Sequence, residues 1–167
     1  FSHGNVSAAT GRFEEALEHY ERALAIRPDL ADAHQNRGNA LQALGRTAEA
    51  LASYDRALAI LPAGAAIQNN RGIVLGKLDR HEEALESFDG ALQIEPDNAA
   101  ALNNRGLVLQ DLKRLDEALE SYDRALKINP DYAEALGNRG VTLRELKRLD
   151  EALESYERAL KIKPDYA

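Results

Sequence analysis

The sequence contains no cysteine, and this absence excludes several kinds of chemistry at once. Without cysteine the chain can form no disulfide bond, no thiolate zinc site, no iron–sulfur cluster and no cysteine nucleophile. The sequence also lacks a basic excess, because 28 Asp and Glu outnumber 21 Lys and Arg and give a net charge of −7. A surface that follows the phosphates of nucleic acid needs the opposite balance, so we expect no nucleic-acid partner.

Long hydrophobic runs are missing as well. No apolar segment approaches the roughly 20 residues that cross a membrane, and residues 1–30 lack the charged-then-apolar order of a signal peptide. We therefore expect no membrane insertion and a cytoplasmic location. With 44% hydrophobic and 29% charged residues, the 167-residue chain has the composition of a folded, soluble protein.

What the sequence does contain is one unit repeated every 34 residues. All five prolines keep this spacing, and so do a glycine column and an aromatic column. The members are Pro28, Pro62, Pro96, Pro130 and Pro164; Gly38, Gly72, Gly106 and Gly140; and Tyr20, Tyr54, Phe88, Tyr122 and Tyr156. Agreement of several columns at one period indicates a repeat protein.

Each period predicts two helices. Between residues 115 and 126 apolar residues recur at helical spacing, acidic Asp116 and Glu117 open the segment, and Pro130 forbids its continuation. No segment alternates with period two, so we predict no strand. A single helix pair cannot cover its own apolar face, and neighbouring pairs must therefore stack. The predicted fold is all-α, an α-solenoid of antiparallel helix pairs.

These columns resemble the tetratricopeptide repeat (TPR), a 34-residue unit with Gly, Ala, Tyr or Phe, Ala and Pro in this order, as found in bacterial TPR arrays. The resemblance covers essentially the whole chain. It implies a right-handed superhelix with repeats at 1–30 (incomplete), 31–64, 65–98, 99–132 and 133–166. The repeat pattern is cut at both ends, since Phe1 falls within a first helix and Ala167 begins a sixth unit. We therefore expect a fragment of a longer protein.

The glycine column and the arginine before each glycine predict how the helices pack. Gly106 is expected to let its helix approach Ala118 and Ala125, with Tyr122 filling the space beside them. Arginine stands before each glycine where the family usually has leucine, and we expect it to pair with an acid of the preceding second helix. The predicted pairs are Arg37–Glu21, Arg71–Asp55, Arg105–Asp89 and Arg139–Asp123.

No catalytic group is predicted. The four histidines occupy four different places in the repeat, and neighbouring acids lie at helix starts, where the helix dipole explains them. The segment from Gly72 to Lys77 resembles a phosphate-binding loop, but it has one residue too few between its glycines and lies inside a predicted helix. We expect no enzymatic activity, no metal and no cofactor.

One asparagine column is not explained by packing. Its members precede each glycine by two residues and are Asn36, Asn70, Asn104 and Asn138. Residues at this place line the concave groove of TPR proteins, and the column resembles the asparagine ladder in the TPR region of O-GlcNAc transferases, which holds an extended peptide by its main chain. A carboxamide both donates and accepts, as main-chain recognition requires. The other predicted peptide-binding residues are Asn39, Asn69, Asn103, Ile73, Leu107 and Val141.

The resemblance implies a protein–protein interaction scaffold that binds an extended peptide in its concave groove. One alternative is that the asparagines join neighbouring helices and fix the register of the repeats. Two others are a recognition arm of a larger glycosyltransferase and a self-assembling module that stacks end to end through Leu153, Tyr156 and Leu160. The carboxylate clamp of cochaperones is disfavoured, because the positions that need lysine hold Gln35, Asn69, Asn103 and Gly137.

Overall fold

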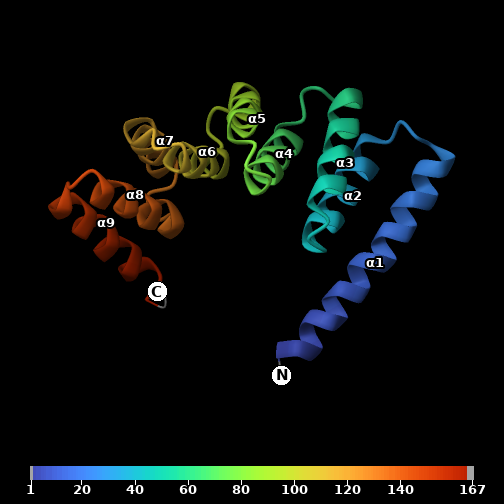
Figure 1. Ribbon diagram of the computed structural model, residues 1–167, viewed down its shortest axis with the longest axis horizontal. Coiled ribbons are helices and arrows are strands. Elements are labelled where there is room, and N and C mark those ends of the chain that lie inside the picture. Colours follow the sequence, from blue (N-terminus) through green and yellow to red (C-terminus); the bar gives the residue numbers. More distant parts are fainter. Residues whose placement is uncertain (1, 165–167) are drawn as a thin grey trace. The chain divides into compact units, whose positions relative to one another are not determined.

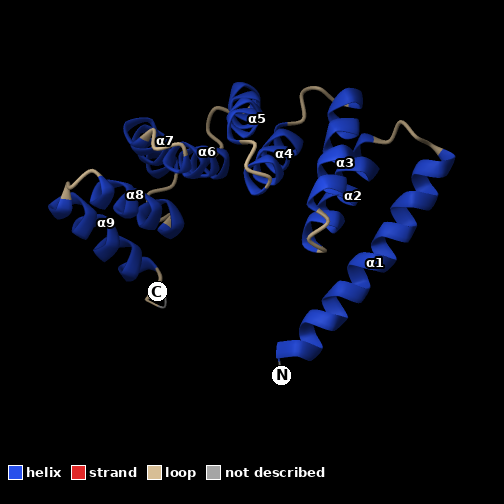
Figure 2. Cartoon of the chain, in the orientation of Figure 1, coloured by secondary structure: helices blue, strands red, loops and turns tan. Residues whose placement is uncertain are grey.

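The computed structural model describes the backbone of residues 2–164 and the side chains of residues 11–164. Every regular element in this part of the chain is an α-helix (Figure 1, Figure 2), so the predicted all-α fold is confirmed. The chain divides into two compact units, Phe1–Arg80 (unit 1) and His81–Ala167 (unit 2). The end residues Phe1 and Ala167, on which the expectation of cut repeats depends, lie outside the described residues.

Unit 1 contains α1 (Ser2–Ile26), α2 (Ala31–Ala43), α3 (Thr47–Ile60) and α4 (Ala65–Lys77). Each helix packs against the next one. The turn between α2 and α3 is short because Gly45 adopts a positive φ of 73°. There the N–H of Arg46 donates to the carbonyl of Leu41 at 2.9 Å, which closes the end of α2.

Unit 2 contains α5 (His81–Ile94), α6 (Ala99–Asp111), α7 (Leu115–Ile128), α8 (Ala133–Glu145) and α9 (Leu149–Ile162). Here too, each helix packs against its neighbour in sequence. The pairs α6–α7 and α8–α9 fall within the predicted repeats 99–132 and 133–166. Consecutive packing of helix pairs is the arrangement of an α-solenoid, as the 34-residue period predicts.

Residues 1–30 depart from this pattern. Gly11 holds the place that Gly45 holds one repeat later, so a turn is predicted there, yet α1 continues through it. The prediction of two helices per period is therefore wrong for this segment. Among the residues before Gly11 that belong to α1, Val6 is the only apolar one larger than alanine. A separate first helix would bury little, and glycine alone does not interrupt a helix.

The arginine column pairs as predicted. The distances are 3.2 Å for Arg37–Glu21, 2.6 Å for Arg71–Asp55, 2.7 Å for Arg105–Asp89 and 2.7 Å for Arg139–Asp123. Sequence analysis missed a second partner of Arg105, whose Nη1 also donates to Oγ of Ser121 at 2.7 Å. The acids are half exposed, and such pairs contribute about 1 kcal/mol or less. Each arginine thus joins helices and fixes their register more than it adds stability.

The glycine column lies directly against the aromatic column. A Cβ added to Gly106 would come within 2.5 Å of Cε1 of Tyr122, a ring that is fully buried. The group nearest to that Cβ is the ring itself, and the expected approach of Gly106 to Ala118 and Ala125 stays a prediction. Gly38 and Tyr54 repeat the arrangement in unit 1, where the corresponding distance is 2.6 Å. The hydroxyls of Tyr54 and Tyr122 thereby reach the first helix of their own repeat, α2 and α6.

Candidate functional site

The predicted asparagine column lies on the first helices of the repeats, in α2, α4, α6 and α8. Asn36 is exposed, and among the described residues it has no hydrogen-bond partner. Asn70, Asn104 and Asn138 are half-buried. The column therefore combines one free amide with others that are partly enclosed by their neighbours.

In unit 1 the amides form a network that is anchored on a tyrosine. The hydroxyl of Tyr54 donates to Oδ1 of Asn39 at 2.8 Å and lies 3.1 Å from Oε1 of Gln42. Nδ2 of Asn70 donates to the same Oδ1 of Asn39 at 3.0 Å and so bridges α4 to α2. Asn69, another predicted site residue, donates to Oδ1 of Asn70 at 3.3 Å. These bonds occupy the amide oxygen of Asn39 and leave its Nδ2 without an internal partner.

Unit 2 has an equivalent network with different members. Nδ2 of Asn138 donates to Oδ1 of Asn103 at 3.0 Å, which joins α8 to α6. Asn103 is only 3% exposed, so its side chain lies between the helices and not on an open surface. Oε1 of Gln110 accepts from Thr142 at 2.9 Å and from Tyr122 at 3.4 Å.

The three apolar site residues differ in their exposure. Leu107 is 38% exposed, whereas Ile73 and Val141 are half-buried. They occupy the position of Asn39 in the repeat, one turn from the asparagine column. Leu107 is therefore the apolar residue best placed to contact a bound side chain.

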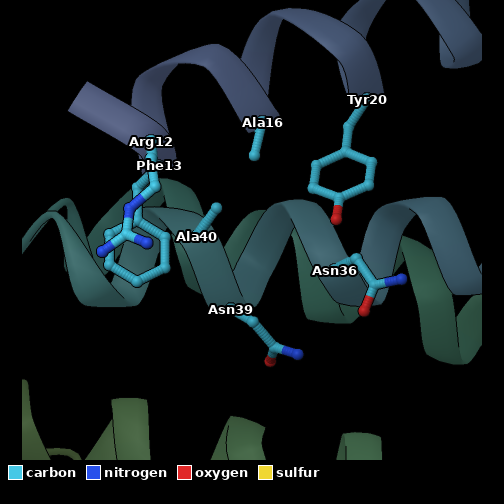
Figure 3. A pocket seen from close by; sticks show the side chains of 7 residues that line it. All are labelled: Arg12, Phe13, Ala16, Tyr20, Asn36, Asn39 and Ala40. Carbon is cyan, nitrogen blue, oxygen red and sulfur yellow. The ribbon is translucent and has the colours of Figure 1, made fainter. Parts of the chain in front are cut away.

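Two cavities in unit 1 meet at Asn39. The first, about 430 Å³, lies between α1 and α2 and includes Ala16, Tyr20 and Asn36 in its lining. Figure 3 shows Ala16 and Tyr20 pointing from α1 toward α2, and the amide of Asn39 pointing away from α1. The second cavity, about 400 Å³, lies between α2 and α4; its lining is Asn39, Gln42, Ala43, Asn70 and Lys77. Together they provide a surface of mixed apolar and polar character that has the size of a ligand site.

Burial and ion pairing set the electrostatics of these networks. Desolvation raises the pKa of Tyr54 to about 12, so its hydroxyl stays protonated and remains a donor. In unit 2, a hydrogen bond from Lys113, 2.9 Å away, lowers the pKa of Glu145, and a bond from Gln110 lowers it further. The carboxylate of Glu145 is therefore held in its charged form.

Sequence analysis did not select four residues of these networks and cavities. Tyr54, which bonds to Asn39, was assigned to packing only, and Gln42, Gln110 and Lys77 were not selected as site residues. The available signal was the 34-residue spacing, since Gln42 and Gln110 lie two periods apart, each 12 residues before a tyrosine of the aromatic column. That the tyrosine hydroxyl reaches them follows only from the close approach at the glycine.

Two negative findings apply to the described residues. No three His, Asp or Glu side chains among them come close enough together to hold a metal ion. No helix among them is both long and apolar enough to cross a membrane.

Known structures with a similar fold are repeat proteins. YrrB, described as a TPR protein with an unusual peptide-binding site, is 28% identical, with a TM-score of 0.79, over 97% of this chain and 84% of YrrB. PilF of Pseudomonas aeruginosa is 27% identical with a TM-score of 0.83, over 90% of this chain and 69% of PilF. MamA of Desulfovibrio magneticus, 19% identical, has a TM-score of 0.85 over 98% of this chain and 94% of MamA, which shows the fold alone.

Sequence families give the same result. Tetratricopeptide repeat models match residues 97–165 and 31–63, and a further TPR model matches residues 4–45 and 77–113. None of the curated proteins compared with the chain matches it in sequence. The 34-residue period, the consecutive helix pairs and these matches agree, and the chain belongs to the tetratricopeptide repeat family.

Proposed function

We propose that the chain is a non-catalytic scaffold that binds an extended segment of a partner protein along the asparagine column. TPR proteins generally act as protein-interaction scaffolds, so a protein partner follows from the family. The observation that carries the finer proposal is Asn36, an exposed amide with no internal partner that lines a cavity beside Asn39. An amide in this setting can both donate to and accept from a peptide backbone.

Two further points support a peptide ligand. Asn70 and Asn138 each use Nδ2 for a bond to the preceding repeat, which positions their amide groups. The Oδ1 of Asn138 has no partner among the described residues and can accept from a peptide N–H. YrrB, 28% identical to this chain, is itself described as having a peptide-binding site.

The same bonds support the alternative that the asparagines fix the register of the repeats. The two roles are separable, because Asn36 has no bond to lose whereas Asn138 is bonded to Asn103. A peptide array screened with the purified chain would provide a probe peptide. We expect Asn36→Ala to weaken binding of that peptide by about threefold to tenfold, the value of one neutral hydrogen bond, with an unchanged melting temperature.

A matched control uses Asn129, which accepts from the N–H of Asp131 outside the groove. Asn129→Ala should leave peptide affinity unchanged. Unchanged affinity in Asn36→Ala, together with lower stability in Asn138→Ala, would contradict peptide binding and favour the architectural role.

Self-association is a second candidate, and it draws on the surface of α9. Leu153 is 59% exposed and Leu160 is 46% exposed, whereas Leu119, the equivalent of Leu153 in α7, is only 6% exposed. Sedimentation that shows a monomer at high concentration would exclude end-to-end stacking. The glycosyltransferase arm, the likeness to O-GlcNAc transferases and the cytoplasmic location remain predictions from the sequence.

A further inference from the structure

A third cavity of unit 1 is lined by residues of α1, α2 and α3. Its volume is about 310 Å³, and it shares no lining residue with the two cavities described above. Leu24 and Ala25 of α1 and Ala52 of α3 provide apolar surface. Arg37 of α2 and Arg56 of α3 add two guanidinium groups. This α1–α3 cavity therefore combines apolar side chains with positive charge.

Arg56 is a charged group without a partner. It is exposed, and it forms no hydrogen bond or ion pair with any described residue. One repeat earlier, Arg22 holds the equivalent place and pairs with Glu18 at 3.2 Å. In α3 the place of Glu18 is taken by Ala52, so the acid that would stand one helical turn before Arg56 is missing. Because Ala52 lines the α1–α3 cavity, the cavity lies beside the missing acid.

Arg37 uses only part of its guanidinium group. Its Nη1 donates to Oγ of Ser53 at 2.7 Å, and its Nη2 donates to Oε1 of Glu21 at 3.2 Å. Its Nε has no partner among the described residues, whereas Nε of Arg105 and of Arg139 each donates to an aspartate at 2.7 Å. The cavity lining thus contains one free guanidinium group and a second one with an unused N–H.

The charges of the lining match an anion with a single charge. Glu21 is the one acid in the lining, and it is already bonded to Arg37. His34 also lines the cavity, and its Nε2 donates to the carbonyl of Pro28 at 2.9 Å. With His34 neutral, two arginines and one glutamate leave one excess positive charge. A carboxylate balances this charge, whereas a phosphate group, with a charge of about −1.5 to −2, exceeds it.

Unit 2 does not repeat the missing acid. Glu120 and Glu154 hold the place of Ala52 there, each four residues before an arginine, Arg124 or Arg158. Residues at this spacing are neighbours on a helix surface, so α7 and α9 carry an acid of their own beside the arginine. The missing acid next to a free arginine is therefore a feature of α3.

We propose that the α1–α3 cavity binds an acidic residue of a partner protein, with its carboxylate on Arg56 and Arg37 and a neighbouring apolar side chain against Leu24, Ala25 and Ala52. Guanidinium groups suit this role because their N–H groups form charge-assisted hydrogen bonds to carboxylates. The inference goes beyond the proposed function, because it adds a second contact surface in which no residue of the asparagine column takes part.

The test compares two capped peptides that differ in one group, acetyl-Ala-Leu-Glu-Ala-amide and the same peptide with Gln in place of Glu. Each is titrated at constant ionic strength into the ¹⁵N-labelled chain while the Nε–H signals of Arg37 and Arg56 are followed by NMR. We expect the Glu peptide to shift both signals and to bind about fivefold more tightly, the value of one ion pair at a partly exposed place. The preference should shrink with added salt.

Two variants sharpen the test. Arg56→Gln should remove the preference for the Glu peptide, and Ala52→Glu should also remove it, because the new carboxylate would pair with Arg56. Both positions are exposed, so neither change disturbs the core. The matched control is Arg124→Gln in unit 2, where Glu120 already stands one turn before the arginine, and it should keep the preference.

The outcomes separate this inference from peptide binding in the groove. Equal affinities for the two peptides, unchanged arginine signals, or a preference that survives in Arg56→Gln would each overturn it. Shifts at Asn36 and Asn70 without shifts at the two arginines would also overturn it, while supporting the proposed function. Shifts at the two arginines that disappear in Arg56→Gln and in Ala52→Glu would support the α1–α3 cavity, whatever the groove binds.

Discussion

The two units present different side chains on similar helix pairs. In unit 1, Asn39 and Lys77 line the groove surface, and Lys77 has no ion-pair partner among the described residues. In unit 2 the place of Asn39 is taken by exposed Leu107, and the place of Lys77 by Glu145, which is already paired with Lys113. The packing below the two surfaces is nevertheless alike. Ligand chemistry can thus vary through a few exposed positions while the buried columns keep the fold.

This comparison assumes that the buried packing is the same beneath the groove surfaces of the two units. Glycine substitutions disturb that packing and therefore test the assumption. A Cβ on Gly38 or Gly106 would come within 2.6 Å or 2.5 Å of a fully buried tyrosine ring. We expect Gly38→Val and Gly106→Val each to lower the free energy of unfolding by about 1–3 kcal/mol through overpacking. Urea denaturation would measure both values, and they should be similar in the two units.

Gly140 provides the matched control within unit 2. A Cβ there would also come within 2.5 Å of a ring, but Tyr156 is only half-buried and can move toward solvent. Gly140→Val should therefore be the mildest of the three substitutions. A larger loss at Gly140 than at Gly106 would show that ring burial does not set the cost.

The turns that follow the first helices share one position of positive φ but not the residue that holds it. Gly45 has a φ of 73°, whereas Asp79 in the same unit and Lys113 and Lys147 in unit 2 have φ values of 57°, 59° and 63°. A left-handed conformation costs a residue with a side chain about 1 kcal/mol or more. We expect Lys147→Gly to raise the free energy of unfolding by about 1 kcal/mol and Gly45→Ala to lower it by a similar amount. Thermal denaturation of both variants would test this, and a destabilised Lys147→Gly would contradict it.

The smallest expected effect concerns pH and the Lys113–Glu145 ion pair of unit 2. The pKa of Glu145 is lowered from its ordinary value of 4.5 in the folded state, chiefly by the hydrogen bond from Lys113. Because the unfolded chain binds this proton more readily, the resulting stability is present above about pH 4.5 and is lost as pH falls through the lower folded-state pKa. Glu145→Gln should therefore lose less stability than the unsubstituted chain over that range, as followed by urea denaturation at each pH. Identical pH profiles would exclude a contribution from this pair.

The sequence predicted the features that depend on periodicity. The helix pairs follow from the spacing of proline and glycine, and the partners of Arg105 and Arg139 follow from two complete columns of opposite charge. Continuity of α1 through Gly11 was not predicted, because a repeat pattern does not tell how much apolar surface a particular segment can bury.

Prediction of the site was less complete for a physical reason. The asparagine column was visible in the sequence, but the burial of Asn103 and its bond from Asn138 depend on how closely two first helices approach. The same holds for Tyr54, whose hydroxyl reaches Asn39 only because the ring lies against Gly38. Periodicity indicates which residues are equivalent, and packing determines which of their polar atoms remain free.

The most direct test of the central claim measures peptide affinity and the free energy of unfolding on one variant, Asn70→Ala with Asn104→Ala, using the peptide selected from the array. Main-chain recognition predicts that affinity for every selected peptide falls by about tenfold to a hundredfold, since two neutral hydrogen bonds are lost. It also predicts that the loss of affinity does not depend on the side chains of the peptide. Leu107→Ala, in contrast, should lower the affinity only for peptides with a large apolar residue at the matching place. Lower stability with unchanged affinity would contradict the claim and would assign the asparagines to the architecture of the repeats.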